Sequence, residues 1–227
     1  MSGDDFIAPH CDQEIAVLFE DDDLIVIDKP SGLLSLSGKN PLNKDSVHHR
    51  LVQQYSGVTM VHRLDFGTSG VMVLARNKVI NAHLTKQFQA RKITKHYLAL
   101  LFGHLPNDNG VIDAPIAKDD FPHQKICHQT GKAALTHYRV LQRFIDSANG
   151  AKISRVLFTP TTGRTHQLRV HSQEIGNPII GCDLYADIID GVNTQELSCR
   201  LCLHASRLEF EHPTSGEPLS FEARCEF

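Results

Sequence analysis

Residues 61–70, VHRLDFGTSG, set one carboxylate, Asp65, between an arginine and a run of turn-forming residues. The apolar segment 71–74, VMVL, follows directly and predicts a strand, so we expect Asp65 on a turn beside a sheet. Such a placement is typical of a catalytic aspartate on a rigid support. An ordinary turn aspartate whose side chain bonds its own backbone explains the same composition equally well. Residues 61–70 alone leave both interpretations open.

The segments around this stretch predict a sheet with helices packed on it. Upstream, residues 22–28 read as a short buried strand ended by Pro30, with a loop over 35–44. Asp45 or Ser46 can cap a helix that continues to the Ser-Gly pair at 56–57.

Downstream, residues 71–75 are expected to form a second strand, and Asn77 to cap a helix that runs to about Arg91. The inward stripe of this helix is predicted to be Val79, Ile80, His83, Leu84 and Phe88, and its outer face Lys78, Lys86 and Arg91.

The remainder of the chain reads as strands with few intervening helices. Further strands are predicted over residues 95–102, 135–141, 153–159 and 201–210. This order favours an α+β fold around a central mixed, mostly antiparallel sheet, flanked by helices and loops. No repeat or linker is visible, so we expect one domain over residues 1–227. The loop over 114–132 is long for a compact domain and is therefore a candidate binding loop.

Composition indicates a soluble, cytoplasmic chain. Of its 227 residues, 41% are hydrophobic, and no apolar run approaches the roughly 20 residues that a bilayer helix needs. The first five residues include two aspartates, Asp4 and Asp5, and are expected to begin no signal peptide. Six cysteines in such a chain are expected to be reduced thiols. Cys199 and Cys202 form the single close pair, and without a second pair they favour small strand residues over a zinc site.

The charges are strongly segregated along the sequence. Residues 66–107 and 147–173 contain no Asp or Glu and together carry ten Lys and Arg. The rest of the chain holds the other 13 basic residues and all 26 acidic ones, so its formal net charge is −13. A basic face on an acidic body is typical of a nucleic-acid-binding protein, although a solvated helix face explains residues 78–92 equally well.

Two more segments place polar residues among apolar ones, where a purely structural core would need no polar group. Tyr97 lies inside the apolar segment 95–102, where its ring can pack and its hydroxyl can point into a cleft. The segment 161–171 begins with a tight turn, leads into a predicted helix and brings Arg164, Arg169 and His171 close together. Apolar residues flank Arg169, so its burial beside a carboxylate is plausible.

At this point the chain resembles the RluA family of pseudouridine synthases, from about residue 22 to the C-terminus. Five motifs stand in the family's order: DKPSG at 28–32, HRLD at 62–65 with TSG at 68–70, KHY at 95–97, GRTHQLR at 163–169, and LHA at 203–205 with HP at 212–213. The short N-terminal segment leads us to expect no S4-type RNA-binding domain. One departure concerns Asp183, which is displaced by one place in the run GCDLY at 181–185, and we assign it no role.

The resemblance implies an isomerase that detaches uracil from ribose and rejoins it through C5, with no cofactor and no metal. It makes Asp65 the catalytic carboxylate, because an anion beside the anomeric carbon can stabilise or trap an oxocarbenium centre. Addition of Asp65 to the uracil ring and removal of a ribose proton by Asp65 are the open alternatives, and both also require the anion. Arg169 is the expected partner that keeps this carboxylate ionised and oriented. Tyr97 is expected to pack against the uracil and to assist proton removal from C5.

The family also implies an RNA substrate whose target nucleotide leaves its stack. Arg63 is expected to fill the gap or hold flanking phosphates, with His62, Arg164 and Leu168 as further substrate-binding residues. Residues 124–132 are similar to dual-specificity members of the family, which implies 23S rRNA and the tRNA anticodon stem-loop as partners, at uridines 746 and 32. We expect the protein to be a monomer and to have no membrane as a partner. A non-catalytic RNA-binding or RNA-chaperone module and a metal-dependent hydrolase are the alternatives.

Overall fold

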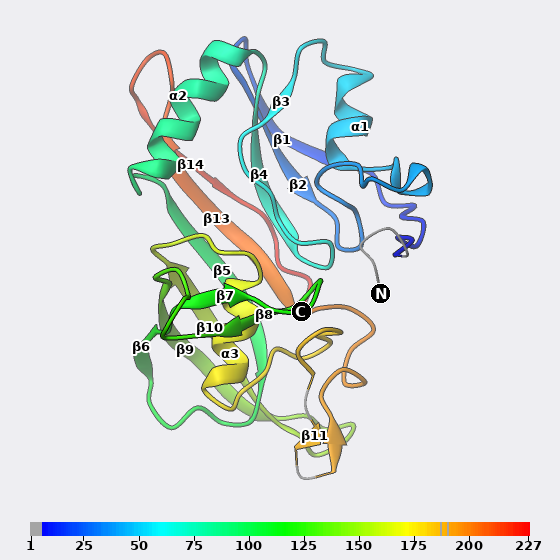
Figure 1. Cartoon of the computed structure of the whole chain (residues 1–227), viewed down its shortest axis with the longest axis vertical. Coiled ribbons are helices and arrows are strands. Elements are labelled where there is room, and N and C mark those ends of the chain that lie inside the picture. Colours follow the sequence, from blue (N-terminus) through cyan, green and yellow to red (C-terminus); the bar gives the residue numbers. More distant parts are fainter. Residues whose placement is uncertain (1–5, 187, 190) are drawn as a thin grey trace. The chain divides into compact units, whose positions relative to one another are not determined.

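In the computed structural model, which describes residues 6–186, 188–189 and 191–227, the chain folds as two units (Figure 1). The N-terminal unit comprises Met1–Lys95 and Ala205–Cys225, and the C-terminal unit comprises His96–His204 and Glu226–Phe227. Strands β5 (Thr94–Phe102) and β13 (Leu203–Glu211) each have residues in both units. This division does not test the expected single domain, which stays a prediction.

A sheet whose β1–β2, β2–β4, β3–β4 and β13–β14 pairs are antiparallel forms the body of the N-terminal unit. Its strands run in the order β1-β2-β4-β13, with β3 paired to β4 and β14 paired to β13. Besides β13, the elements are β1 (Ala16–Glu20), β2 (Leu24–Lys29), the 3₁₀ helix η1 (Pro41–Asn43), α1 (Val47–Val52), β3 (Thr59–Met60), β4 (Ser69–Ala75), α2 (Lys78–Gln89) and β14 (Pro218–Glu222).

Strand β4 is buried along its whole length and is the core of this unit. One of its faces packs on α2, where Ile80 and Leu84 join Val71 and Val73 in a single apolar cluster. Register pairs Lys29 of β2 with Gly70 of β4. The start of β4 and the end of β2 therefore lie side by side, which brings the segments 28–32 and 62–70 together.

The predicted cap Asn77 is confirmed, and of the two candidates for the first helix, Asp45 and Ser46, the structure has Ser46 as the N-cap. The Ser46 side chain accepts a hydrogen bond from His49 N, and that of Asn77 accepts from Val79 N and Ile80 N. The predicted stripe of α2 was partly wrong, because Val79 is 68% exposed and His83 is exposed as well. Helix α1 also ends before the expected stop, at Val52.

The C-terminal unit is a second antiparallel arrangement, with strand order β5-β10-β9-β6. Its core includes Leu101, Val156 and Phe158 of the sheet with Leu168 and Val170 of helix α3. Besides β5, the elements are β6 (Asn109–Asp113), β7 (Ile116–Lys118), β8 (Gln124–Ile126), β9 (Leu135–Ile145), β10 (Lys152–Pro160), α3 (Gln167–Glu174), β11 (Ile188–Ile189) and β12 (Val192–Asn193).

Two expectations for this part of the chain need correction. The predicted loop over 114–132 contains a hairpin in which β7 and β8 pair antiparallel. The last predicted strand begins at Leu203, not at residue 201, and both Cys199, which is exposed, and Cys202, which is buried, lie before it, so neither is a strand residue. The α+β class itself is confirmed, with three α-helices beside many antiparallel strands in the described residues.

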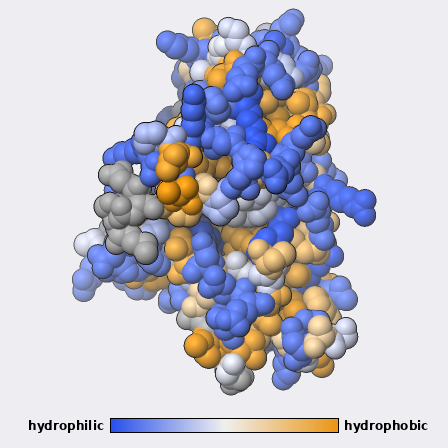
Figure 2. All heavy atoms as spheres, turned by 90° about the vertical axis from the view of Figure 1, so that its right-hand side faces the viewer, coloured by the Kyte–Doolittle hydropathy of each residue, from blue (hydrophilic) through white to orange (hydrophobic). Residues whose placement is uncertain are grey.

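The surface is mostly hydrophilic on the face that Figure 2 shows, with hydrophobic atoms in separate patches. Exposed apolar side chains include those of Phe6, Leu42 and Ile188. Within the described ranges, no helix has the length and apolarity that crossing a membrane requires.

Candidate active site

The predicted catalytic aspartate begins a tight turn between β3 and β4. Thr68 N donates to Asp65 O at 3.1 Å and closes this turn, which we call the Asp65 turn (residues 64–68). Leu64 and Thr68 are buried at its two ends, whereas Asp65 itself is half-buried. The turn thus leaves the aspartate side chain at the boundary between the core and solvent.

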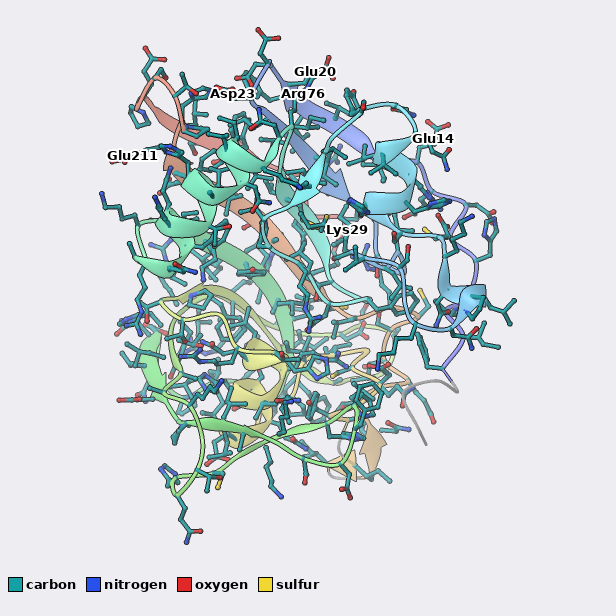
Figure 3. The ribbon with its side chains drawn as sticks, turned by 45° about the horizontal axis from the view of Figure 1, so that its top comes forward. Glu14, Glu20, Asp23, Lys29, Arg76 and Glu211 are labelled. Atoms are coloured by element: carbon teal, nitrogen blue, oxygen red, sulfur yellow. The ribbon has the colours of Figure 1, made fainter. Side chains whose placement is uncertain are left out.

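A fully buried lysine holds the backbone of this turn from behind. Lys29 Nζ donates to Leu33 O at 2.7 Å, to Pro30 O at 2.9 Å and to Phe66 O at 3.2 Å. An ammonium group has three N–H donors, and each meets a carbonyl oxygen here. Figure 3 shows Lys29 inside the unit, while the labelled acidic side chains lie toward its periphery. Lys29 therefore ties the Asp65 turn to the end of β2.

The residues after Lys29 continue this support. Ser31 Oγ donates to Gly67 O at 2.7 Å, and Gly32 N donates to Phe66 O at 3.0 Å. Ser35 Oγ donates to Leu64 O at 2.7 Å and accepts from Leu64 N at 3.1 Å. The backbone of the Asp65 turn is thus held by side chains and an amide from residues 29–35, not by the side chain of Asp65.

A glycine at the start of β4 completes the fit. Gly70 has a φ of 114°, and a Cβ built there would lie 2.2 Å from Ala205 O of β13. A larger residue would push β4 away from β13 and displace the turn before it. The need for glycine at this position is therefore steric.

The carboxylate of Asp65 makes none of the bonds that an ordinary turn aspartate makes. Within the described residues of the N-terminal unit, nothing donates a hydrogen bond to its two oxygens; the one bond the residue accepts goes to its backbone carbonyl. The interpretation as a side chain that bonds its own backbone is therefore wrong for Asp65. Its lone pairs are available for another group.

The histidine of the same stretch has a supporting place. His62 Nε2 accepts from Val73 N at 3.1 Å, so the ring proton is on Nδ1, and the ring stacks on Phe88 at 4.8 Å. Burial, and then the charge of Lys95, lower the pKa of His62 to about 3. The imidazole is therefore neutral near pH 7 and bridges β4 and α2. Its expected part in substrate binding stays a prediction.

The remaining predicted residue of this stretch, Arg63, is exposed. It stands two residues before Asp65 on an irregular segment, where a long cationic side chain can reach outward. Its expected contact with RNA stays a prediction.

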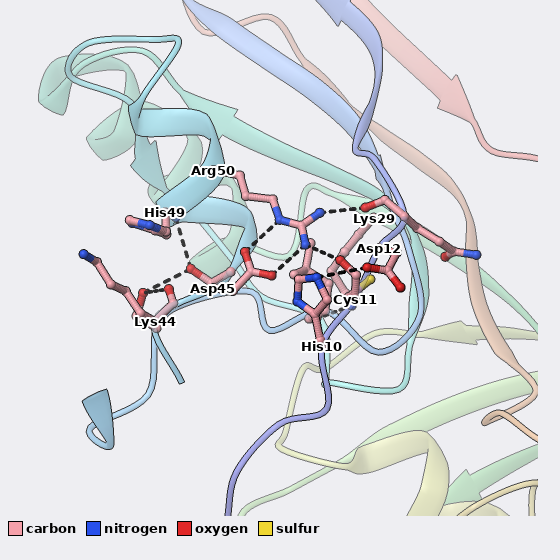
Figure 4. A network of polar contacts seen from close by, with 12 residues as sticks. His10, Cys11, Asp12, Lys29, Lys44, Asp45, His49 and Arg50 are labelled. Atoms are coloured by element: carbon pink, nitrogen blue, oxygen red, sulfur yellow. Dashed lines mark hydrogen bonds and ion pairs between the residues drawn. The ribbon is translucent and has the colours of Figure 1, made fainter. Parts of the chain in front are cut away.

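An N-terminal segment packs beside the Asp65 turn. Arg50 of α1 donates to both Asp45 oxygens, at 2.7 and 2.6 Å, to Gln13 O at 2.6 Å and to Cys11 O at 2.5 Å (Figure 4). The hydrogen bond from Arg50 lowers the pKa of the Asp45 carboxyl below its usual range. Further along, the ring of Phe6 meets that of Phe66 edge to face at 5.7 Å.

The predicted catalytic arginine belongs to the C-terminal unit and lies at the start of α3. The side chain of Arg169 is 5% exposed. Its Nε donates to Cys182 Sγ at 3.2 Å, a terminal nitrogen forms an ion pair with Asp183, and the guanidinium lies 5.2 Å from the centre of the Tyr185 ring. Because Asp65 and Arg169 belong to different units, their expected pairing stays a prediction.

The turn that leads into α3 is held by a buried glutamine. Gln167 Oε1 accepts from Thr162 Oγ1 at 2.8 Å and from Arg164 N at 3.0 Å. Its amide nitrogen donates to Leu135 O at 3.1 Å and to Thr136 Oγ1 at 3.0 Å. These four bonds use both ends of one side chain to fasten the turn to β9, and they explain why Arg169 occupies a defined place.

The other predicted residues of this unit have mixed surroundings. Tyr97 on β5 is half-buried, stands opposite Phe158 and packs on the same apolar core as Leu168. Leu168 is 6% exposed and is a core residue. Arg164 Nε donates to Ala133 O at 3.0 Å. The expected contacts of Tyr97, Leu168 and Arg164 with substrate stay predictions.

Sequence reasoning missed Asp183, to which it assigned no role. A signal was present, since a buried arginine needs an acceptor and the window 147–173 around Arg169 offers no carboxylate. Asp183 is one of the first acidic residues after that window. The one-place displacement in GCDLY drew attention away from it.

No metal centre is visible in the described part of the chain, where no group of three or more His, Cys, Asp or Glu side chains is placed to hold an ion. All six cysteines are free thiols.

Comparison with known proteins identifies the family. A family model described as RNA pseudouridylate synthase matches residues 23–174, more than half of the chain. The chain belongs to this family. It is an RNA pseudouridine synthase, an isomerase, and the non-catalytic and hydrolase alternatives are thereby set aside.

Curated relatives of this pseudouridine synthase cover nearly its whole length. It is 44% identical over 221 residues to the dual-specificity RNA pseudouridine synthase RluA of Vibrio vulnificus, covering 96% of this chain and 86% of the relative. It is 40% identical over 215 residues to the protein of that name from Escherichia coli K12, covering 94% of each.

Solved structures agree with this assignment. Human RNA Pseudouridylate Synthase Domain Containing 1 superposes with a TM-score of 0.77 at 29% identity, over 95% of this chain and 85% of that one. Human RNA Pseudouridylate Synthase Domain Containing 4 gives 0.70 at 25% identity, over 92% and 88%. The pseudouridine synthase fold expected from the motifs is confirmed.

Proposed function

We propose that this pseudouridine synthase has dual specificity and modifies one uridine in 23S rRNA and one in the tRNA anticodon stem-loop, at positions 746 and 32. The support is the name that several relatives share at 40–44% identity over more than nine-tenths of the chain. Unpaired loop nucleotides cost less to extrude than duplex ones, which suits two stem-loop substrates of different sequence context.

The catalytic carboxylate in this proposal is Asp65. Isomerisation must loosen the bond between uracil and ribose C1′ without releasing the base, and an anion at this carbon stabilises or traps the developing positive charge. The observation that carries the proposal is that the backbone of the Asp65 turn is held by other residues and not by the carboxylate. Residues 29–35 hold its backbone, and within the N-terminal unit the carboxylate itself is left without a hydrogen-bond donor.

The other proposed roles are those that the resemblance to the family implies. Arg169 keeps the carboxylate ionised and directs it through charge-assisted hydrogen bonds. Tyr97 packs against the target uracil and assists proton removal from C5 when the base rejoins. Arg63 fills the gap left by the extruded nucleotide or binds its neighbouring phosphates, and His62, Arg164 and Leu168 shape the surroundings of the substrate.

Replacement of Asp65 tests this assignment directly. Asp65→Asn keeps the shape and removes the charge, so tritium release from stem-loop RNA labelled at uracil C5 is expected to fall to background while RNA affinity is retained. Asp22→Asn is the matched control, because Asp22 is an exposed carboxylate of the same unit, and full activity is expected. Tritium release by both Asp65→Asn and Asp65→Ala would sink the assignment.

RNA binding is expected to depend on salt because of the two acid-free windows. Lys78, Lys86, Arg91 and Lys92 are exposed, as a phosphate-binding face requires. The logarithm of affinity should fall linearly with the logarithm of salt concentration, and each lysine changed to glutamine should lower the slope by up to about 1. A slope near zero would show that the windows do not contact RNA.

The two substrates are tested by mapping pseudouridine in cellular RNA with and without the gene. Loss at both positions supports dual specificity, whereas loss at one alone would restrict the enzyme to one RNA class. We further propose a monomer that works in the cytoplasm, to which the six free thiols are suited. Light scattering of the purified protein and fractionation of cells test these two points.

A further inference from the structure

Three contacts of Arg169 come from one short segment of the chain. Cys182, Asp183 and Tyr185 provide, in that order, an acceptor for Nε, an ion-pair partner for a terminal nitrogen, and an aromatic face for the guanidinium plane. We call these three residues the Arg169 cradle. A guanidinium that is held by one edge, one end and one face has little freedom to rotate.

The cradle is itself attached to two other elements through the hydroxyl group of Tyr185. This oxygen accepts from Gln124 N of β8 at 2.8 Å and lies 2.8 Å from His166 Nδ1, in the turn before α3. The ring also meets those of His123 and His166 edge to face, at 5.8 and 5.6 Å. Tyr185 is 4% exposed, so these contacts are formed in the interior.

The exposure and charge of Asp183 suit it to orient Arg169 more than to stabilise the fold. The Arg169 side chain is 5% exposed, but that of Asp183 is 62% exposed. A carboxylate so open to water contributes little to folding through an ion pair. It still restricts where the guanidinium points, because the bond it accepts is charge-assisted and directional.

We propose that Asp183 and Tyr185 are positioning residues that aim the Arg169 guanidinium, and that Tyr185 couples its position to the β7–β8 hairpin. This inference rests on the proposed catalytic role of Arg169. The hairpin belongs to the segment 114–132, a candidate RNA-binding segment, so its contact with RNA is transmitted through Gln124 and Tyr185 to the arginine. The displaced GCDLY run acquires a function: it supplies all three members of the Arg169 cradle.

The test separates the chemical step from RNA binding. Tritium release is measured in single turnovers with saturating enzyme, and RNA affinity is measured independently for Asp183→Asn, Tyr185→Phe and Asp183→Glu. We expect the first two to lower the single-turnover rate about tenfold with affinity within about twofold, because misaligned groups cost rate more than binding. Asp183→Glu should recover part of the rate.

A matched control is available in the same unit. Asp108 is likewise an exposed carboxylate that pairs with an arginine: its side chain is 79% exposed and lies 2.7 Å from Arg143, which is half-buried. Asp108→Asn removes an ion pair with a similarly exposed carboxylate away from the Arg169 cradle, so the wild-type rate is expected. Thermal unfolding of every variant verifies that it is folded at the assay temperature.

A double-variant cycle decides whether Asp183 acts through Arg169. Arg169→Lys keeps a positive charge in the buried site but loses the planar fork, so Asp183→Asn should cause no further loss in that background. A full tenfold loss there, or a wild-type rate for Asp183→Asn alone, would overturn the inference. A wild-type rate for Tyr185→Phe would overturn the coupling to the hairpin. If Arg169→Lys itself has the wild-type rate, the proposed role of Arg169 fails instead.

Discussion

Two turns of the N-terminal unit begin with an aspartate and use it in opposite ways. In the turn before β2, Asp21 Oδ1 accepts from Asp23 N and Leu24 N at 2.8 Å each, and its second oxygen accepts from His212 Nε2 at 3.0 Å. In the Asp65 turn, the backbone is held by Lys29 and by other groups of residues 29–35. Both carboxylate oxygens of Asp21 therefore accept hydrogen bonds that hold its turn, whereas the carboxylate of Asp65 is left available to another group.

The two histidines of these regions differ in the same way. His212 Nδ1 accepts from Thr214 N and Ser215 N, so its proton is on Nε2 and points at Asp21. His62 accepts from Val73 N and donates nothing to Asp65 in the described structure. The proposed catalytic carboxylate of Asp65 thus differs from the structural carboxylate of Asp21 in which groups hold the backbone of its turn. The following predictions test this difference.

The largest effect on stability is expected from removing the buried ammonium behind the Asp65 turn. Lys29→Met fills a similar volume but donates nothing, so one buried and two part-buried carbonyl oxygens lose this donor. We expect the free energy of unfolding to fall by about 3 kcal/mol, and tritium release by the folded fraction to fall with it, as measured by urea denaturation and single-turnover assays. Lys78→Met, at an exposed position, should change stability by less than about 0.5 kcal/mol. Equal stability and rate for Lys29→Met would mean that the lysine does not hold the turn.

A smaller effect is expected at the other turn. Asp21→Ala removes the acceptor for two backbone N–H groups and for His212, which should lower the free energy of unfolding by about 1–2 kcal/mol and leave the single-turnover rate unchanged. Loss of tritium release in this variant would break the contrast between the two aspartates.

This contribution of Asp21 should depend on pH. Burial alone would raise the pKa of Asp21, but hydrogen bonds from Leu24 N, Asp23 N and His212 lower it below the usual value. A carboxyl with a lowered pKa stabilises the fold above its unfolded pKa and loses this effect as the pH falls through the folded value. The difference between wild type and Asp21→Ala should therefore be complete at pH 7 and shrink below about pH 4. Chemical denaturation at several pH values measures it.

The smallest effect is expected from His62. Its pKa of about 3 in the folded protein lies below the unfolded value of about 6.5, so the unfolded chain binds the extra proton and stability falls as the pH drops below about 6.5. The half-buried ring keeps some contact with solvent, so we expect a loss of about 1 kcal/mol between pH 7 and 5. His62→Gln should remove this loss, while His83→Gln, at an exposed position, should leave it in place. A pH dependence that is identical in all three proteins would contradict a His62 that is neutral in the folded protein.

Features that depend on neighbours along the chain were predicted well. The caps at Ser46 and Asn77 and the strands β2 and β4 follow from local backbone chemistry and from apolar runs. The β7–β8 hairpin was missed because strands of three residues are too short for an alternating pattern. The stripe of α2 was partly wrong because helical spacing cannot tell which edge of the stripe meets the sheet, and packing on β4 exposed Val79.

For the site, the motifs of the amino-acid sequence predicted an RNA-modifying enzyme, which the comparisons confirm. The same motifs predicted Asp65, Tyr97 and Arg169 as its catalytic residues, and these roles stay predictions. Only the tertiary structure decided which hydrogen bonds each side chain makes. Lys29 contacts Phe66 across 37 positions of the chain, and Asp183 reaches Arg169 across 14. Such partners are chosen by packing, because a buried donor or acceptor must be satisfied by whatever the fold brings within about 3 Å. Packing thus left the Asp65 carboxylate without a hydrogen-bond donor in its own unit and placed the Arg169 cradle around Arg169.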